Sequence, residues 1–377
     1  MDFTHIKNAG AVALEDCIMV KGTPVTAGSK ILEGFTAPFG AAAAERLENA
    51  GAAIWGKTGM PEFSVVNVVQ GEDGIAPSVK AVLEDSASAC LCNDLFGLYR
   101  RQAAENNLVY IHPTYGTVSR YGLIPAASSM DQIGVLAKDV ATGFSLLSAI
   151  AGHDSRDGAM YPETSYSYKS LDRDVRLCVP ENILKLSDSG FRSSAEELSD
   201  SAFRSSAEEL SRCFALTDEP LPLFDVYKQV MYILACAEIS NNINRYDGVK
   251  FGYRSASSES LESLYTNTRT EGFGIQVKLA AVMGAFVLSA DQYVPYYEKA
   301  MKIRGIIRSS LQFDKYDVIA LPVSISGGAY DNLSLYALSA LAGLPCLSFS
   351  YKGRGIQLIG GVKGEGALLK AWEVMHS

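Results

Sequence analysis

Runs of apolar and polar residues alternate along the chain and predict alternating helices and strands. Residues 41–50, "AAAAERLENA", favour a helix that Gly51 ends, and the apolar stretch 52–58 predicts a short buried strand. The same pattern predicts one more helix, in the run 138–154, and three strands, at 316–324, 344–351 and 355–361. Alternation of this kind, with glycines between the elements, predicts an α/β architecture.

The stretch 93–101, "NDLFGLYRR", predicts the end of a strand, a turn and the start of a helix. Gly97 lies at the bend, where its freedom to take a positive φ suits a tight turn. The preceding region is harder to interpret, and only a weakly amphipathic helix around 78–88 is predicted there.

Residues 189–212 contain an internal duplication with a period of twelve residues, "SGFRSSAEELSD" followed by "SAFRSSAEELSR". Twelve residues of α-helix leave a phase difference of about 120°, so Phe191 and Phe203 cannot face one stripe of a single helix. We therefore expect that one copy packs and that the other is a solvated extension. A duplication tolerated at the surface is favoured over a duplicated partner-binding helix.

Composition and charge narrow the class of protein. Apolar residues make up 48% of the 377 residues, which is typical of a globular protein. The formal net charge is −9, and an acidic chain repels phosphate backbones, so direct strong nucleic-acid binding is not expected. No apolar run approaches the ~20 residues of a membrane span. The start also lacks a signal-peptide pattern, and these features together predict a cytoplasmic protein.

The cysteines and histidines predict no disulfide framework and no metal site. Seven cysteines are scattered along the chain, and in a reducing compartment they stay free thiols. The four histidines are far apart, and the pair in "CLC" at 90–92 is too close in sequence to clamp one zinc ion. We expect no cofactor.

Several long segments resemble the amidase signature family and, within it, the A subunits of the glutamyl-tRNA(Gln) and aspartyl-tRNA(Asn) amidotransferases. They are residues 21–64, 112–157, 244–255, 265–274, 288–304, 341–351 and 355–361, of which "HPTYGTVSRYGLIPAASSMDQIGVLAKDV" is the longest continuous match. The resemblance covers nearly the whole chain. It implies a single amidase-signature domain over residues 1–377, with a large mixed sheet covered by helices on both faces. The family's N-terminal helical segment is expected to be absent.

The resemblance also implies a catalytic triad of a serine, a second serine in a cis peptide and a lysine, and this sequence departs from it at each position. In "AVALEDCIMVKG" the lysine position holds Glu15. In "EDGIAPS" the bridging serine position corresponds to Gly74, and only Ser78 remains nearby. In "CNDLFGLYRRQ" the nucleophile position holds Leu98. In "VKLAAVMG" the arginines that the family uses as a substrate anchor are also replaced.

The resemblance places the oxyanion-stabilising turn at Leu95, Phe96 and Gly97, where Phe96 replaces a glycine. Cys92 and Cys17 are the alternative nucleophiles, since Cys17 lies two residues from a carboxylate that could act as a base. A free cysteine is more often a small buried apolar residue.

The polar residues around this turn are expected to be structural. Asp94 and Arg100 are expected to form an ion pair that fixes this turn. Asp131 and Gln132 are expected to hold another turn in place. His112 is expected to be a structural hydrogen-bonding residue.

The sequence thus favours a catalytically inactive relative of the A subunits of these amidotransferases, with a binding or scaffold role. Its expected partners are B-like or C-like subunits or a second copy of itself. The alternatives are an active amidase or glutamine amidotransferase subunit with a rewired site at Cys17 or Cys92, and a small-molecule sensor that uses the remaining pocket.

Overall fold

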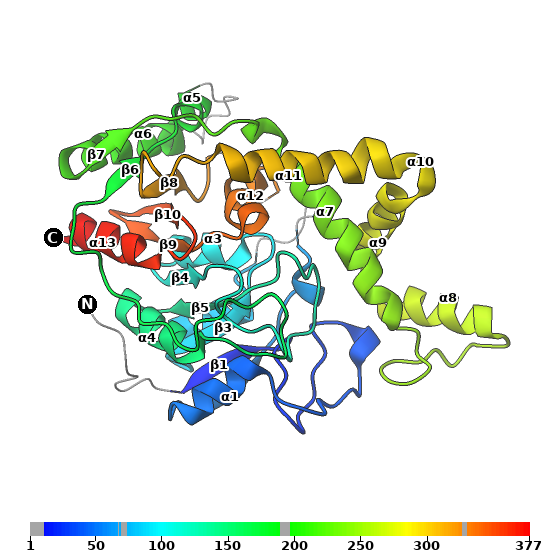
Figure 1. Ribbon diagram of the computed structural model, residues 1–377. Helices are drawn as coiled ribbons and strands as arrows, with labels where there is room; N and C mark the ends of the chain where they lie inside the picture. Colours follow the sequence, from blue (N-terminus) through cyan, green and yellow to red (C-terminus); the bar gives the residue numbers. More distant parts are fainter. Residues whose placement is uncertain (1–10, 67, 69–73, 189–196, 326–329) are drawn as a thin grey trace.

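The strands of the chain form one large mixed sheet (Figure 1). The computed structural model describes residues 11–66, 68, 74–188, 197–325 and 330–377. Within them, ten strands lie in the spatial order β2 (Ile54–Thr58), β1 (Val12–Glu15), β3 (Ala89–Asn93), β5 (Ile133–Ala137), β4 (Val109–His112), β9 (Cys346–Tyr351), β10 (Arg354–Gly360), β8 (Val318–Pro322), β6 (Arg176–Cys178) and β7 (Ala215–Thr217). The three strands at each end of this order pair in parallel, and the pairings between them are antiparallel. The predicted α/β fold with a large mixed sheet is confirmed.

Helices cover this sheet (Figure 1). They are α1 (Ala42–Asn49), α2 (Pro77–Leu83), α3 (Leu98–Glu105), α4 (Val140–Ile150), α5 (Glu181–Asp188), α6 (Glu197–Cys213), α7 (Tyr227–Asn242), α8 (Leu261–Gly272), α9 (Ile275–Leu288), α10 (Ala290–Gln292), α11 (Lys299–Ser310), α12 (Leu333–Ala342) and α13 (Glu365–His376). Helices α8 to α10 extend away from the sheet (Figure 1). A π-helix at Tyr293–Glu298 joins α10 to α11. None of the described helices alone is long and apolar enough to cross a membrane, although α9 and the bent segment after it pass that test together.

The sheet buries both faces, and alternate residues of each central strand enter different clusters. Ala13 of β1 and Cys92 of β3 belong to a smaller apolar cluster with residues of α2 and α3. Their neighbours Leu14 and Leu91 belong to the main core. Because side chains alternate across a strand, Glu15 at the end of β1 shares the face of Ala13, which is the face covered by α3.

Most elements predicted from the pattern are present. The helices expected near residues 41 and 138 are α1 and α4, the three later strands are β8, β9 and β10, and α2 matches the weak helix prediction. The prediction that 52–58 forms a buried strand is wrong in one respect. The strand exists as β2, but it lies at the edge of the sheet and pairs only with β1, which leaves Trp55 52% exposed.

The second copy of the duplication packs against the core along one face of a helix. It lies in α6, where Phe203, Ala207 and Leu210 recur at helical spacing and are all buried. The expectation that one copy packs is therefore confirmed for the second copy, whose other face exposes Glu208 and Ser211. Residues 189–196 of the first copy, Phe191 included, lie outside the described residues.

Candidate functional site

The last residue of β1, Glu15, is a fully buried carboxylate with three hydrogen-bond donors around it. The Tyr99 hydroxyl donates to its Oε1, the Asn93 backbone N–H donates to its Oε2 at 2.6 Å, and the Cys17 thiol lies 3.5 Å from Oε2. Burial raises the pKa of Glu15 to about 7, although these three hydrogen bonds oppose the increase. The expected lysine position thus holds a carboxylate whose three hydrogen-bond partners are all donors.

Tyr99, which the sequence did not single out, is the residue that best explains how a carboxylate is tolerated here. It lies in the first turn of α3, fully buried, and its ring stacks on that of Tyr110 with 5.9 Å between centroids. Burial and the neighbouring charge of Glu15 raise the pKa of Tyr99 well above its usual range, so the hydroxyl keeps its proton and donates it. The only signal in the sequence was an aromatic residue directly after Leu98.

The turn between β3 and α3 is held rigidly by one buried ion pair. Asp94 Oδ2 accepts from Arg100 Nε at 2.8 Å, and both side chains are fully buried, as predicted. Asp94 also accepts the backbone N–H groups of Tyr99 and Arg100, so it caps the start of α3. Gly97 has φ +84°, and a Cβ there would lie 2.1 Å from Cγ of Tyr336. Only glycine fits this bend.

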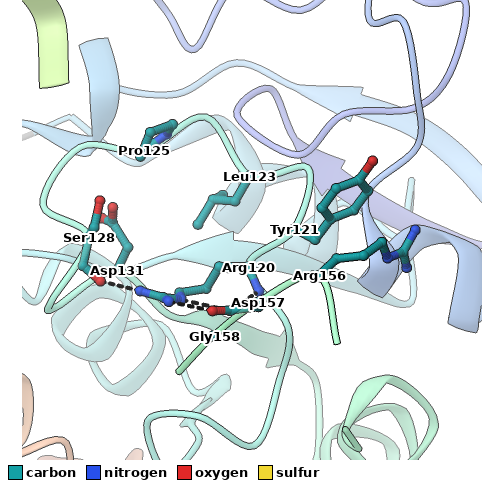
Figure 2. A pocket seen from close by; sticks show the side chains of 9 residues that line it. All are labelled: Arg120, Tyr121, Leu123, Pro125, Ser128, Asp131, Arg156, Asp157 and Gly158. Atoms are coloured by element: carbon teal, nitrogen blue, oxygen red, sulfur yellow. Dashed lines mark hydrogen bonds and ion pairs between the residues drawn. The ribbon is translucent and has the colours of Figure 1, made fainter. Parts of the chain in front are cut away.

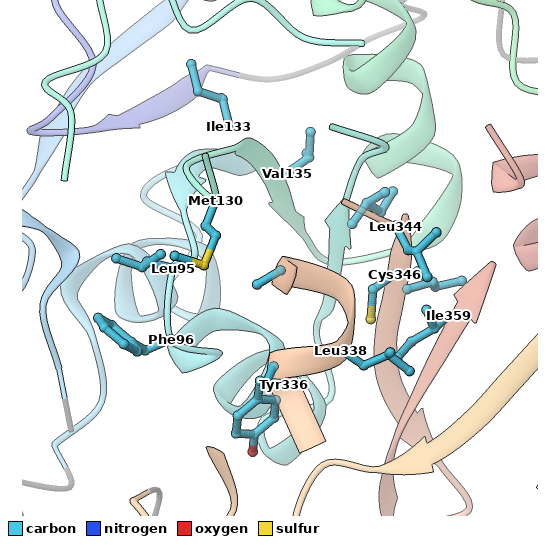
Figure 3. Packing of buried hydrophobic residues seen from close by; sticks show 14 of the residues in the cluster. Leu95, Phe96, Met130, Ile133, Val135, Tyr336, Leu338, Leu344, Cys346 and Ile359 are labelled. Atoms are coloured by element: carbon cyan, nitrogen blue, oxygen red, sulfur yellow. The ribbon is translucent and has the colours of Figure 1, made fainter. Parts of the chain in front are cut away.

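Leu95 and Phe96, expected in the oxyanion-stabilising turn, have buried side chains in the main apolar core (Figure 3). The Phe96 ring lies 6.0 Å from that of Tyr232, which stacks on Tyr330 at 5.8 Å. A row of aromatic rings therefore extends from this turn. In a turn that binds a substrate oxygen, backbone N–H groups must be approachable, and bulky side chains beside them restrict that approach.

The three expected triad positions all lie against helix α3. Leu98 is its first residue and packs partly buried against the smaller apolar cluster, and Glu15 bonds to the next residue along the helix. Gly74 is exposed, but its carbonyl accepts from Gln102 Nε2 at 2.8 Å, one turn further along α3. The structure thus gathers the three positions around one helix, with no hydroxyl or amine side chain at any of them. Among the described residues no peptide bond is cis.

The two cysteines expected as alternative nucleophiles are buried thiols. Cys17 is 1% exposed and Cys92 is fully buried. Burial, together with the charge of Glu15, raises the pKa of both thiols well above their usual range, which keeps them protonated. A protonated thiol is a weak nucleophile.

The polar residues next to the turn differ in how well they are satisfied. Asp131 accepts from Asn93 Nδ2 at 3.0 Å, and Gln132 Nε2 donates to the carbonyl of Pro113 at 2.9 Å, so both act structurally as expected. The expectation for His112 is wrong. It is fully buried, and neither ring nitrogen has a hydrogen-bond partner, because β4 places the ring in the sheet interior. Burial and the charge of Arg100 lower the pKa of His112 well below its usual range.

One cavity, with Asp131 in its lining, has a volume of about 230 Å³ (Figure 2). It is lined by Arg120, Tyr121, Leu123, Pro125, Ser128, Asp131, Arg156, Asp157 and Gly158. Arg120 forms an ion pair with Asp157 at 2.6 Å and also donates to the Ser128 carbonyl, so its charge is already compensated.

Two further cavities, of about 590 and 330 Å³, lie beside Tyr168 and Arg304. None of the three cavities has Glu15, Gly74 or Leu98 in its lining. Within the described ranges no group of three His, Cys, Asp or Glu side chains is placed to hold a metal ion.

Comparisons with known proteins agree with the resemblance seen in the sequence. The family model described as Amidase matches residues 11–71 and 87–329. The A subunit of glutamyl-tRNA(Gln) amidotransferase from Lachnoclostridium phytofermentans is 35% identical over 410 residues, covering 96% of this chain and 81% of that protein. The corresponding protein of Trichodesmium erythraeum is 36% identical over 406 residues, covering 96% of this chain and 82% of its own length.

Among solved structures, the A subunit of the Thermotoga maritima glutamyl-tRNA(Gln) amidotransferase superposes with a TM-score of 0.71 at 26% identity, covering 97% of this chain and 83% of its own. The native peptide amidase of Stenotrophomonas maltophilia has a TM-score of 0.72 at 23% identity, covering 97% and 82%. The latter similarity concerns the fold alone.

Proposed function

Because the chain belongs to the amidase family, we propose that it is a catalytically inactive relative of the amidotransferase A subunits, one that acts by binding other molecules. The observation that carries this proposal is the buried Glu15 with its donors Tyr99 and Asn93. A position that must supply an amine base for serine chemistry instead holds an acid, and its surroundings are built to satisfy that acid.

The other two positions support the same proposal. The side chain of Leu98 has no lone pair with which to attack a carbonyl carbon, and Gly74 has no side chain at all. In a serine protease, losing the nucleophile or the base alone already lowers the rate by about 10⁶. A chain that lacks all three catalytic groups should therefore keep almost none of that rate enhancement. Leu95 and Phe96 in the adjoining turn are buried in the main core, and Phe96 occupies a position where the resemblance implies a glycine.

One contact favours the competing function, an active amidase with a rewired site. The Cys17 thiol points at a Glu15 oxygen 3.5 Å away, which is a thiol next to an acceptor for its proton. The raised pKa of this thiol and its burial argue against attack on a substrate, because the thiolate is the reactive form.

Binding partners are proposed by analogy with the relatives, whose names identify them as subunits of an amidotransferase. A B-like or C-like subunit is the partner that this analogy offers. We propose a cytoplasmic location on the same analogy, and one amidase-signature domain over the whole chain, since a single sheet contains strands from residue 12 to residue 360.

The test is release of ammonia from glutamine, asparagine and simple primary amides by the purified chain. A catalytically competent relative with an intact triad serves as the positive control in the same buffer. We expect no ammonia above background, and Cys17→Ser and Cys92→Ser should change nothing. Turnover by the native chain that either cysteine substitution abolishes, while circular dichroism stays unchanged, would overturn the proposal in favour of the rewired site.

A further inference from the structure

The helical segment from α9 to α11 carries an unusual share of the exposed apolar surface. Among the described residues, 21 large apolar side chains are exposed, and ten of them lie within residues 275–306. They are Ile275, Val282, Met283, Phe286, Leu288, Tyr293, Val294, Tyr296, Met301 and Ile306. Such concentration in one segment distinguishes a surface patch from the scattered apolar residues that every protein exposes.

Helix α9 buries one narrow face and leaves the rest uncovered. It packs on α7 through Val277, Ala280, Gly284 and Val287. The approach is so close at Gly284 that a Cβ there would lie 2.0 Å from the Cys236 carbonyl oxygen. The segment projects away from the sheet (Figure 1), and its outer face is left open by the described parts of the chain.

The patch continues around the bend after α9. Pro295 lies inside the π-helix, where its missing N–H and its ring favour a widened turn. The bend of 74° brings the Phe286 and Tyr296 rings to 5.5 Å in an edge-to-face contact. The exposed side chains of α9 and of the π-helix therefore form one surface, which we call the arm patch.

The size of the arm patch matches one side of a stable interface. The eight exposed side chains of the arm patch expose about half of their surface, and at roughly 150–200 Å² each they present on the order of 700 Å², close to the ~800 Å² that one partner buries in an interface of standard size. Large exposed patches on monomers are smaller, at roughly 300–600 Å².

The arrangement along α9 favours a second copy of this chain over a different protein. Lys278 is the only charged residue of α9, and homodimer interfaces are the more apolar class. Residues 275, 279, 282 and 286 lie on the outward stripe of α9, with Leu279 half-buried and the other three exposed, and this stripe keeps its spacing when the helix is reversed. In a two-fold antiparallel pairing, Ile275 faces the partner's Phe286 and Leu279 faces the partner's Val282.

We propose that two copies of the chain dimerise through the arm patch, with their α9 helices packed antiparallel about a two-fold axis between Leu279 and Val282. The proposal does not depend on whether the chain is catalytically inactive, because the patch is separate from the Glu15 cluster.

The first test is the mass of the full chain in solution, measured by light scattering after size exclusion and by sedimentation from 1 to 100 µM. We expect a dimer of twice the 40.5 kDa chain, and the double variant Val282→Glu/Phe286→Glu should be monomeric at the same concentrations. Trp55→Glu on the edge strand is the matched control, because it removes an exposed apolar side chain elsewhere and should leave the dimer intact. Unchanged circular dichroism shows that the variants are folded.

A second test fixes the orientation. In a Cys213→Ser background, which removes the exposed thiol, the double variant Ile275→Cys/Phe286→Cys should form a covalent dimer under mild oxidation. The variant Ile275→Cys alone should not, because the antiparallel pairing separates the two copies of residue 275. A native chain that is monomeric at 100 µM, or a dimer that persists in Val282→Glu/Phe286→Glu, would refute the proposal. So would a monomer that binds uncharged phosphatidylcholine vesicles through this patch.

Discussion

The buried carboxyl of Glu15 should make the stability of the protein depend on pH in a way that one substitution removes. Its pKa of about 7 in the folded protein lies above the ordinary value of 4.5. The folded state therefore holds this proton more tightly than the unfolded state does. The corresponding stabilisation is fully present below pH 4.5 and falls as the pH rises towards 7.

The magnitude follows from the two pKa values. At about 1.4 kcal/mol for each pH unit, the interval from 4.5 to about 7 corresponds to about 3 kcal/mol of unfolding free energy. Between pH 5 and pH 8 the native chain should lose about 2–3 kcal/mol of it. The origin of the effect is the cost of burying a charge, which the donors Tyr99 and Asn93 offset only in part.

The variant Glu15→Gln isolates this contribution. Glutamine has nearly the same volume, its amide oxygen can accept the Asn93 N–H, and its NH₂ group can donate to the Tyr99 hydroxyl, whose proton can turn to Ser78. Other titrating groups are common to both proteins, so they cancel when the two free energies are subtracted.

The assay is equilibrium unfolding in urea, followed by circular dichroism, at pH 5, 6, 7 and 8 and constant ionic strength. The stability of the native chain relative to Glu15→Gln should fall by about 2–3 kcal/mol across this range. Asn49→Ala is the control, because Asn49 is exposed on α1 and has no titrating side chain, so its difference from the native chain should stay flat. If the Glu15→Gln difference also stays constant to within about 0.5 kcal/mol, the buried carboxyl is not the proton-binding group that the contacts indicate.

Three further predictions concern the frame of the site, each measured by urea unfolding. Arg100→Ala leaves Asp94 buried without its partner and should cost about 3–5 kcal/mol; a cost below about 1 kcal/mol would contradict the ion pair's role. Phe203→Ala should cost about 3–5 kcal/mol, because the second copy of the duplication packs in the core, and a neutral result would place it at the surface. Gly97→Ala should cost about 3 kcal/mol, since its Cβ would meet a buried tyrosine ring at 2.1 Å. Gly51→Ala, with a similar φ of +83° and open space around it, should cost only about 1 kcal/mol, and equal costs would show that sterics play no part.

Local features of the site could be predicted from the sequence because they depend on near neighbours. The strand, turn and helix of residues 93–101 follow from an apolar run, one glycine and a helix-favouring segment, and they appear as β3, Gly97 and α3. The ion pair of Asp94 with Arg100 spans six residues, within reach of a single turn. The identities of Glu15, Gly74 and Leu98, on which the proposed loss of catalysis depends, are also properties of the sequence.

Features that depend on distant segments were decided by the tertiary structure. The pairing of Glu15 with Tyr99 joins residues 84 positions apart, and no local pattern encodes it. The edge position of β2, the unpartnered ring of His112 and the packing of Phe203 likewise depend on which elements become neighbours. The apolar composition of a helix predicts that it will be covered, but it does not identify the segment that covers it. Helix α9 has the composition of a core helix, and yet much of its surface is exposed. The sequence by itself determined which chemical groups the chain has, and the tertiary structure decided which of them meet, because contacts between distant segments form only when the whole sheet assembles.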